Sequence, residues 1–215
     1  MRFFKYTEKQ YINDILQKGR IGLGTFCYYR KHPNEQIGDA SEAIGCGTTT
    51  IGEQLLQEAD KSKGLIADKV RMHGPPLPSH TAAQTVDSLV LTDCYVYCLT
   101  TEASEETMKS FGPNYGCVEF LDVEKLAAGL CHALDRKGLL GPNATAKQGL
   151  CRYRFEKAIA VDSKSDLLKL AFLKHNKFRH QKEYRLVIPP QYDKVIEYQT
   201  LEVPELVGNV REISF

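Results

Sequence analysis

The stretch HQKEYRLVI, from His180 to Ile188, places charged and amide side chains at the start of an apolar strand. Gln181, Glu183 and Arg185 are spaced two residues apart, so in an extended strand their side chains would lie on one face. A carboxylate, an amide and a guanidinium on one face of a core strand are suited to binding or catalysis. The alternative is a solvated strand face with a Glu–Arg ion pair, which contributes only about 0–1 kcal/mol to stability.

Composition limits the class of protein. The chain has 215 residues with 42% hydrophobic content and a net charge of +1, which suits a single domain spanning residues 1–215 and does not indicate bulk attraction to polyanions. Its seven cysteines form no CxxC pair, so we expect reduced thiols and a cytoplasmic location. We find no signal peptide and no apolar stretch near the ~20 residues that span a membrane, so no membrane association is expected.

Alternating strand and helix patterns predict an α+β fold, with a mixed, mainly antiparallel sheet and interspersed helices. The predicted strands cover 2–6, 20–29, 88–100, 116–121, 151–161, 178–188, 194–203 and 210–215. The predicted helices cover 7–19, 51–64, 102–112, 122–134 and 163–175. The segment 71–85 holds three prolines and predicts a long irregular loop, which is often functional or disordered in a compact domain.

Local signals define several helix ends. Thr7 followed by Gln10 predicts a capping box at the first helix, and Gly19 is placed to end it. Asp122 is the expected cap of the helix over 122–134. The strand glycines Gly22 and Gly24 would let another backbone or a ligand approach closely.

Other candidate sites have a structural alternative. Basic residues between Lys174 and Lys182 could hold phosphates, or they could form a solvated helix end. Asp39 and Glu42 are expected to cap a turn. They could instead bind a ribose, or form a two-metal site together with Glu183. The histidines show no metal-binding spacing, so no bound metal is predicted.

Several segments taken in order resemble a known group of proteins. They are FFKYT, ILQKGRIGLGTFCYYR, IGDASEA, YVYCLT, SFGPNYGCVEF and QKEYRLVI. Together they resemble a large bacterial family of unknown function that is often found near phage-defence genes. That family carries an aromatic-Tyr start, an acidic turn and a late E-x-R motif.

The same motif order is similar to that of the ADP-ribosyltransferase superfamily. The resemblance implies that Glu183 is the catalytic acid and that Gln181 orients the acceptor. Arg185, the last residue of the E-x-R motif, is expected to belong to the same catalytic group. Thr100 and Thr101 would stand for the Ser-Thr-Ser strand of that superfamily, with Arg2 or Lys5 as the first-strand residue. The residues expected to bind the cofactor NAD are Lys5, Tyr6, Gly22, Gly24, Tyr28, Arg30, Thr100 and Thr101.

The resemblance implies an enzyme that uses NAD, either an ADP-ribosyltransferase or an NAD glycohydrolase, with a role in phage defence or counter-defence. In such chemistry a fixed carboxylate stabilises the oxocarbenium-like transition state at the ribose carbon. The acceptor could be a nucleic acid or a protein. Two alternatives stay open: a non-catalytic nucleotide-binding sensor or inhibitor, and a metal-dependent nuclease.

Overall fold

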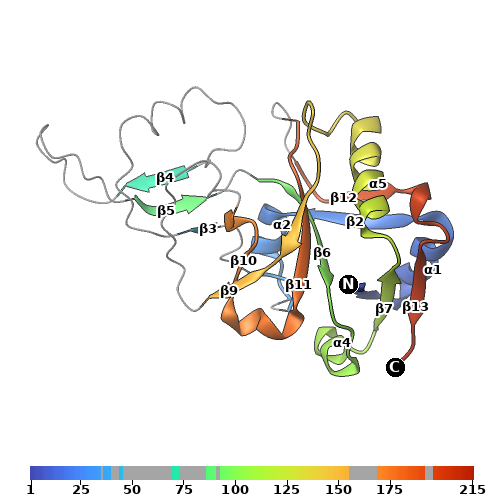
Figure 1. Ribbon diagram of the computed structural model, residues 1–215. Coiled ribbons are helices and arrows are strands. Elements are labelled where there is room, and N and C mark those ends of the chain that lie inside the picture. Colours follow the sequence, from blue (N-terminus) through green and yellow to red (C-terminus); the bar gives the residue numbers. More distant parts are fainter. Residues whose placement is uncertain are drawn as a thin grey trace, which may run out of the picture. The chain divides into compact units, whose positions relative to one another are not determined.

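The computed structural model describes residues 1–34, 36–39, 44–45, 69–72, 86–90, 93–154, 169–191 and 196–215 (Figure 1). Contacts divide the chain into two compact units. The first unit consists of Met1–Ala40, Asp93–Cys151 and Lys177–Phe215, and the second of Ser41–Thr92 and Arg152–Asn176. The expectation of a single domain spanning residues 1–215 stays a prediction.

The first unit is built on one sheet whose paired strands are all antiparallel, which confirms the predicted α+β class with a mainly antiparallel sheet. The order is β12-β2-β6-β1-β7-β13, and β11 also pairs with β6 and with β8. The strands are β1 (Phe3–Glu8), β2 (Arg20–Thr25), β6 (Tyr95–Thr100), β7 (Tyr115–Phe120), β8 (Lys147–Leu150), β11 (Glu183–Ile188), β12 (Gln199–Glu202) and β13 (Val210–Ile213).

Strand β6 is the branch point of this sheet. One of its edges pairs with β11 along its whole length, from Thr100 opposite Glu183 to Tyr95 opposite Ile188. Its other edge is shared, because β1 pairs only with Thr100 and β2 pairs only with Tyr95 and Val96. We call this divergence of β1 and β2 the fork. Figure 1 shows its two branches, with β2 beside β12 and β7 beside β13.

One face of the sheet, here called the core face, holds the apolar core. Alternate residues of β6 and β11 point into it, and α1 (Lys9–Lys18) and α5 (Val123–Arg136) add their apolar sides. The principal members from these elements are Ile12, Ile15, Tyr95, Tyr97, Leu99, Leu126, Leu130, Leu134, Leu186 and Ile188.

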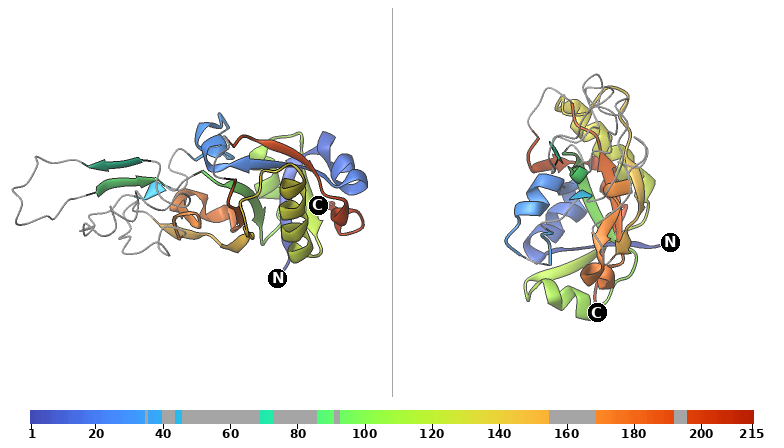
Figure 2. Two further views of the ribbon diagram at one scale, coloured as in Figure 1. Left: turned by 90° about the horizontal axis from the view of Figure 1, so that it is seen from above. Right: turned by 90° about the vertical axis from the view of Figure 1, so that its left-hand side faces the viewer.

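The opposite face, here called the second face, receives the remaining residues of the same strands. These include Cys98, Thr100, Glu183 and Arg185, which are cross-strand neighbours on β6 and β11. Helix α2 (Phe26–Lys31) packs here, since a Cβ atom on Gly24 would lie 2.8 Å from the Tyr29 ring. Figure 2 shows α5 and α2 approaching the sheet from different sides.

The first helix differs at its start from the prediction. Strand β1 continues through Thr7, which pairs with Gly116, so α1 begins only at Lys9. Its N-cap is Glu8, which makes no side-chain capping bond, and the predicted capping box is wrong. Gly19 does end the helix as predicted, in a left-handed conformation with φ of 60°.

The segment predicted as a strand over 20–29 changes to helix half-way. Thr25 accepts a hydrogen bond from the Tyr28 amide and so caps α2. The prediction of a strand through Tyr29 is therefore wrong. The caps of two other helices follow the usual rule, with Ser104 before α4 (Glu105–Phe111) and the predicted Asp122 before α5.

The late segment also differs from a single long strand. Asn176–Gln181 forms the 3-10 helix η1, and strand β11 begins only at Glu183. The segment Leu173–His175 forms strand β10, so the predicted helix over 163–175 is wrong at its end. A second 3-10 helix, η2 (Pro204–Leu206), follows β12.

The second unit contains two small sheets. Strands β3 (Ile44–Gly45), β5 (Val86–Val90) and β4 (Lys69–Met72) form an antiparallel sheet in that order. Strands β9 (Arg152–Arg154) and β10 pair in parallel. The predicted strand over 88–100 is thus divided between β5 and β6. The predicted helix over 51–64 and residues 73–85 of the predicted loop lie outside the described residues.

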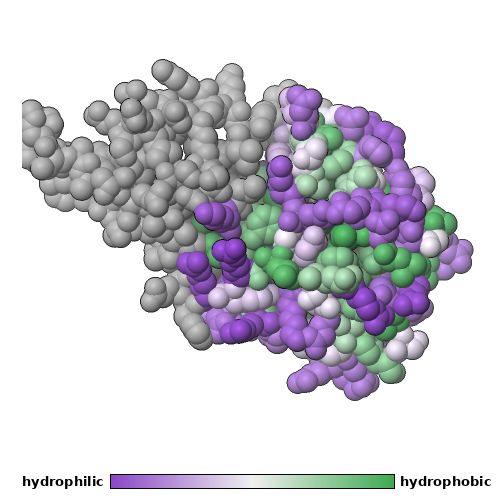
Figure 3. All heavy atoms as spheres, viewed as in Figure 1, coloured by the Kyte–Doolittle hydropathy of each residue, from purple (hydrophilic) through white to green (hydrophobic). Residues whose placement is uncertain are grey.

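The surface of the first unit is mixed in character. Figure 3 shows hydrophilic and apolar side chains side by side on the face that it presents. The large apolar side chains that are exposed, among the described residues, are Met1, Tyr11, Leu121, Leu150, Tyr198, Val207 and Phe215. Within this part of the chain, no helix has the length and apolar character needed to cross a membrane.

Glu119 on β7 connects the two ends of the chain. Its carboxylate accepts hydrogen bonds from Arg2 Nε at 2.6 Å and from Arg211 Nε at 2.8 Å. The hydrogen bond from Arg2 is the main cause that lowers the pKa of Glu119 from 4.5 to about 2, with Arg211 adding to it and burial opposing it. The protein is therefore stabilised by ionised Glu119.

Replacing Gly19 with alanine should destabilise the fold. The new Cβ would lie 2.1 Å from the Val203 carbonyl oxygen, in addition to the cost of about 1–2 kcal/mol for a left-handed non-glycine residue. Gly208→Ala is the matched control, because Gly208 has φ of 81° and nothing within 4 Å of the added atom. Urea denaturation should show a larger loss for Gly19→Ala, and equal losses would contradict the close approach to Val203.

Glu119→Gln should lower the free energy of unfolding by about 1–2 kcal/mol at pH 7, a modest value because both arginines are exposed. The folded-state pKa is below the unfolded value, so this stabilisation is complete above pH 4.5 and disappears as the pH falls towards 2. Denaturant titrations across that range should show the two proteins converging. Glu105→Gln, which affects an exposed pair with Lys109, is the control and should change little at any pH.

Candidate functional site

Glu183 begins strand β11 on the second face and is only 4% exposed. Arg185 Nε donates a hydrogen bond to Glu183 Oε1 at 2.5 Å, and Arg185 is fully buried. The two side chains thus share a strand face, as their spacing predicts. Removing one member of such a buried ion pair leaves the other charge poorly compensated.

The surroundings of Glu183 include an aromatic ring. Burial raises the pKa of Tyr29 well above its usual value, and the next causes are the charges of Cys98 and Glu183. Tyr29 belongs to α2, Cys98 to β6 and Glu183 to β11, so three separate elements converge beside the carboxylate. Cys98 is the cross-strand partner of Arg185.

Gln181 is not on the strand face of Glu183, and this part of the prediction is wrong. It is the last residue of η1, and its Nε2 donates to the Gln36 carbonyl at 2.8 Å. The cause is Lys182, whose φ of 43° interrupts the extended backbone between Gln181 and Glu183. Side chains therefore alternate between the two faces of the strand only from Glu183 onward.

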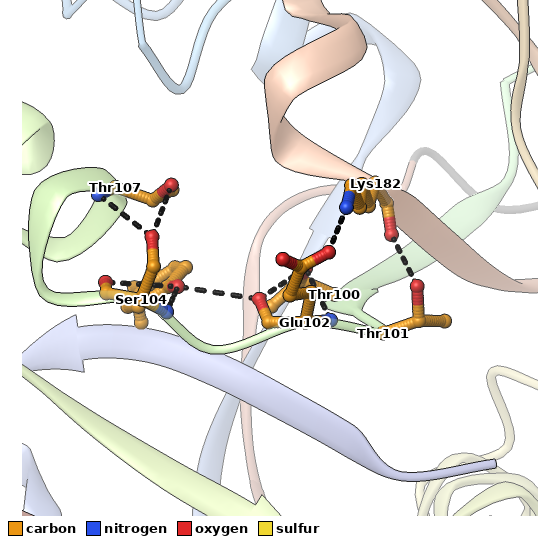
Figure 4. Close-up of polar contacts among 7 residues, drawn as sticks. Thr100, Thr101, Glu102, Ser104, Thr107 and Lys182 are labelled. Atoms are coloured by element: carbon orange, nitrogen blue, oxygen red, sulfur yellow. Dashed lines mark hydrogen bonds and ion pairs between the residues drawn. The ribbon is translucent and has the colours of Figure 1, made fainter.

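The turn at Lys182 is held from the end of β6 (Figure 4). The Lys182 carbonyl accepts hydrogen bonds from the Thr101 amide at 3.1 Å and from Thr101 Oγ1 at 3.2 Å. The Lys182 ammonium group contacts the Glu102 carboxylate. These contacts stabilise a left-handed conformation that is unfavourable for lysine, next to the candidate catalytic residue.

Tyr6 holds the following residues in place. Its hydroxyl accepts a hydrogen bond from the Ser104 amide at 2.9 Å, and burial raises its pKa. Its ring stacks on Phe111, with 5.3 Å between ring centroids. Thr100 Oγ1 donates to the Glu102 carbonyl at 3.0 Å. Hydroxyl groups therefore position the end of β6 and the start of β11; they belong to Tyr6, Thr100 and Thr101. Contact of these residues with NAD stays a prediction.

Lys5 lies away from this group. Its ammonium group donates to the Cys98 carbonyl at 2.8 Å and lies 4.6 Å from the Tyr97 ring centroid. Because Tyr97 belongs to the core, Lys5 points to the core face and closes the gap in pairing at the fork. Its side chain does not join Glu183 on the second face.

The strand glycines admit aromatic rings. A Cβ atom on Gly22 would lie 1.7 Å from the Tyr198 hydroxyl. A Cβ atom on Gly24 would likewise be too close to the Tyr29 ring. Tyr28 connects these rings, with its centroid 5.0 Å from that of Tyr198. Close approach at Gly22 is thus observed, but to tyrosine side chains. Arg30 lies in the last turn of α2.

Sequence reasoning missed Cys98, Tyr115 and Tyr198. For Cys98 a signal was available, since period two along β6 places it on the face of Thr100. The positions of Tyr115 and Tyr198 depend on strand pairings far apart in sequence, which no local pattern reveals.

The basic run divides at its middle. Lys174 lies in β10 of the second unit, whereas Lys177 and Lys182 belong to the first. The Lys177 ammonium group lies 4.7 Å from the centroid of the buried Phe178 ring. A continuous phosphate-binding run from Lys174 to Lys182 stays a prediction.

Within the described ranges, no group of three or more His, Cys, Asp or Glu side chains could hold a metal ion. Asp39 is buried there, and Glu42 lies outside those ranges. The metal-dependent nuclease therefore stays an untested alternative.

No protein-family model matches this chain, and no curated protein or solved structure matches it either. The function is therefore inferred from the chemistry of the site itself.

Lys182→Gly and Lys182→Val should differ in stability, because glycine adopts positive φ freely whereas a β-branched residue does not. Both variants lose the exposed pair with Glu102, so the valine variant should be less stable by about 1–2 kcal/mol. Urea denaturation measures this difference, and Glu102→Gln reports the effect of the ion pair alone. Equal stability of the glycine and valine variants would show that the turn is not constrained.

Proposed function

We propose that this protein is an ADP-ribosyltransferase-like enzyme that uses NAD, with Glu183 as its catalytic carboxylate. The observation that carries the proposal is the buried position of Glu183 at the end of a forked sheet, beside the Tyr29 ring and the end of β6. The order of motifs that resembles the ADP-ribosyltransferase superfamily supports the same assignment.

In the proposed reaction, the bond between nicotinamide and the ribose C1′ breaks, and nicotinamide leaves with the bonding electrons. Glu183 would stabilise the positive charge that develops at C1′. An acceptor on a nucleic acid or protein would then attack C1′ and lose a proton; attack by water would make the enzyme an NAD glycohydrolase. Gln181 lies in η1, off the face of Glu183, and its amide donates to the Gln36 carbonyl, so its proposed role in positioning the attacking group is supported by the family resemblance alone.

The remaining residues would bind NAD or hold the catalytic residue in position. Tyr28 and Tyr29 offer rings for stacking on the nicotinamide or the adenine. Lys182 and Thr101 would fix the backbone that carries Glu183. A role in phage defence or counter-defence belongs to the proposal through the family resemblance alone.

A non-catalytic nucleotide-binding protein, acting as a sensor or inhibitor, is the second candidate. It is favoured by the contact between Arg185 Nε and Glu183, because a guanidinium at 2.5 Å partly neutralises the charge that catalysis requires. The two candidates differ in a single measurable respect, which is release of nicotinamide from bound NAD.

Glu183→Gln should lower the rate of nicotinamide release about a hundredfold or more, because it removes the anion that stabilises the transition state. The experiment incubates the wild-type and variant proteins with NAD and quantifies free nicotinamide by chromatography. Unchanged release by the folded variant would refute the catalytic role of Glu183.

The control must separate catalysis from stability, since Glu183→Gln also weakens a buried ion pair. Leu130→Ala serves this purpose, because Leu130 lies in the core on α5 and its truncation typically costs about 2–5 kcal/mol. Below its unfolding transition, this variant should keep wild-type activity. If wild-type protein binds NAD in calorimetry but releases no nicotinamide, the second candidate is correct.

A further inference from the structure

A second group of aromatic residues gathers at the open end of the fork. We define the tyrosine cluster as Tyr11, Tyr28, Tyr115 and Tyr198, which come from α1, α2, β7 and the segment before β12. The Tyr28 and Tyr198 centroids are 5.0 Å apart. Tyr11 and Tyr198 are 51% and 48% exposed, so the cluster presents ring surface to solvent.

Glu8 places a carboxylate within this cluster. It ends β1 and is the cross-strand partner of Tyr115. After burial, its negative charge is the largest influence that raises the pKa of both Tyr28 and Tyr115, and it also raises the pKa of Tyr198. Glu8 is thus next to Tyr115 in the sheet, and its charge also acts on Tyr28 and Tyr198.

The charge of Glu8 is not balanced locally. Its Oε2 accepts a hydrogen bond from Gln10 Nε2 at 2.7 Å, which is a neutral partner. In the part of the chain that the structure describes, Glu8 forms no ion pair. The neighbouring Lys9 directs its ammonium group to the Pro113 carbonyl at 3.4 Å.

A carboxylate among exposed tyrosine rings favours an organic cation. The ring faces carry negative potential and attract a cation within about 6 Å of their centroids. A guanidinium group fits best, because it is flat enough to cover a ring and can donate two hydrogen bonds to one carboxylate. A lysine ammonium group lacks the flat surface, and a pyridinium ring lacks N–H donors on the ring.

We propose that Glu8 and the tyrosine cluster form a binding site for the guanidinium group of an arginine side chain on a protein partner. This site does not include Glu183, although it shares Tyr28 with the rings proposed above to stack on NAD. The proposal does not depend on NAD chemistry, because it concerns binding of a guanidinium group.

The test uses the whole protein labelled with 3-fluorotyrosine and observed by 19F NMR, with resonances assigned from single Tyr→Phe variants. The probe is N-acetylarginine methylamide, and the matched control is N-acetylcitrulline methylamide, which has the same shape without the charge. Arginine should cause saturable shifts at Tyr11, Tyr28, Tyr115 and Tyr198, while citrulline should not. Tyr97, which is 1% exposed in the core, is the internal reference and should not shift.

Variants identify the contributing groups. Glu8→Gln should weaken arginine binding about tenfold, as expected for loss of a charge-assisted hydrogen bond, and Tyr198→Leu should weaken it about two- to fivefold. Glu105→Gln on α4 removes an equal charge elsewhere and should leave affinity unchanged. Added salt should weaken binding to the wild-type protein.

Three results would overturn the proposal: no saturable shift with arginine, equal shifts with citrulline, or full affinity in Glu8→Gln. A fourth arm uses the N-methylnicotinamide cation. Tighter binding of this pyridinium than of arginine would assign the cluster to a nucleotide and refute an arginine site. Each readout is a binding shift, so loss of the proposed NAD activity would not affect the outcome.

Discussion

The division of one edge of β6 between two strands determines the arrangement of the first unit. A central strand normally has one neighbour on each side, but here β1 takes the Thr100 end and β2 takes the Tyr95 end. The backbone groups between them need other partners, because buried polar groups left unpaired are costly. The ammonium group of Lys5 supplies one at the Cys98 carbonyl, and the fork can therefore exist inside a packed fold.

The two faces of the strands at the fork differ in polarity, with an apolar core on one face and charged side chains on the other. Tyr97 and Leu99 point into the apolar core, while their neighbours Cys98 and Thr100 lie on the face of Glu183 and Arg185. The buried Glu183–Arg185 pair is costly to desolvate and would be easily replaced by apolar residues if stability were its only role. A carboxylate kept in such a position is consistent with binding or catalysis, and the close guanidinium is the feature that a catalytic account must accommodate.

Sequence patterns predicted the features that local physics determines. Gly19 ends α1 and Asp122 caps α5 because each satisfies helix-end groups within a few residues. The predictions that were wrong failed because of contacts between residues far apart in the sequence. Thr7 pairs with Gly116 and so belongs to β1, and Thr101 holds Lys182 at positive φ. In the candidate site, the two-residue spacing of Glu183 and Arg185 was enough to predict that they share a strand face. The orientation of Lys5 and the positions of Tyr115 and Tyr198 could be known only from the folded structure.

We propose that NAD binds on the second face, where β6 ends and β11 begins. Amide hydrogen exchange followed by mass spectrometry, with and without NAD, tests it most directly. With NAD bound there, exchange should slow in peptides covering Tyr95–Ser104 and Gln181–Ile188 and stay unchanged in the α5 peptide Val123–Arg136. Protection confined to other segments, or no protection at saturating NAD, would contradict it.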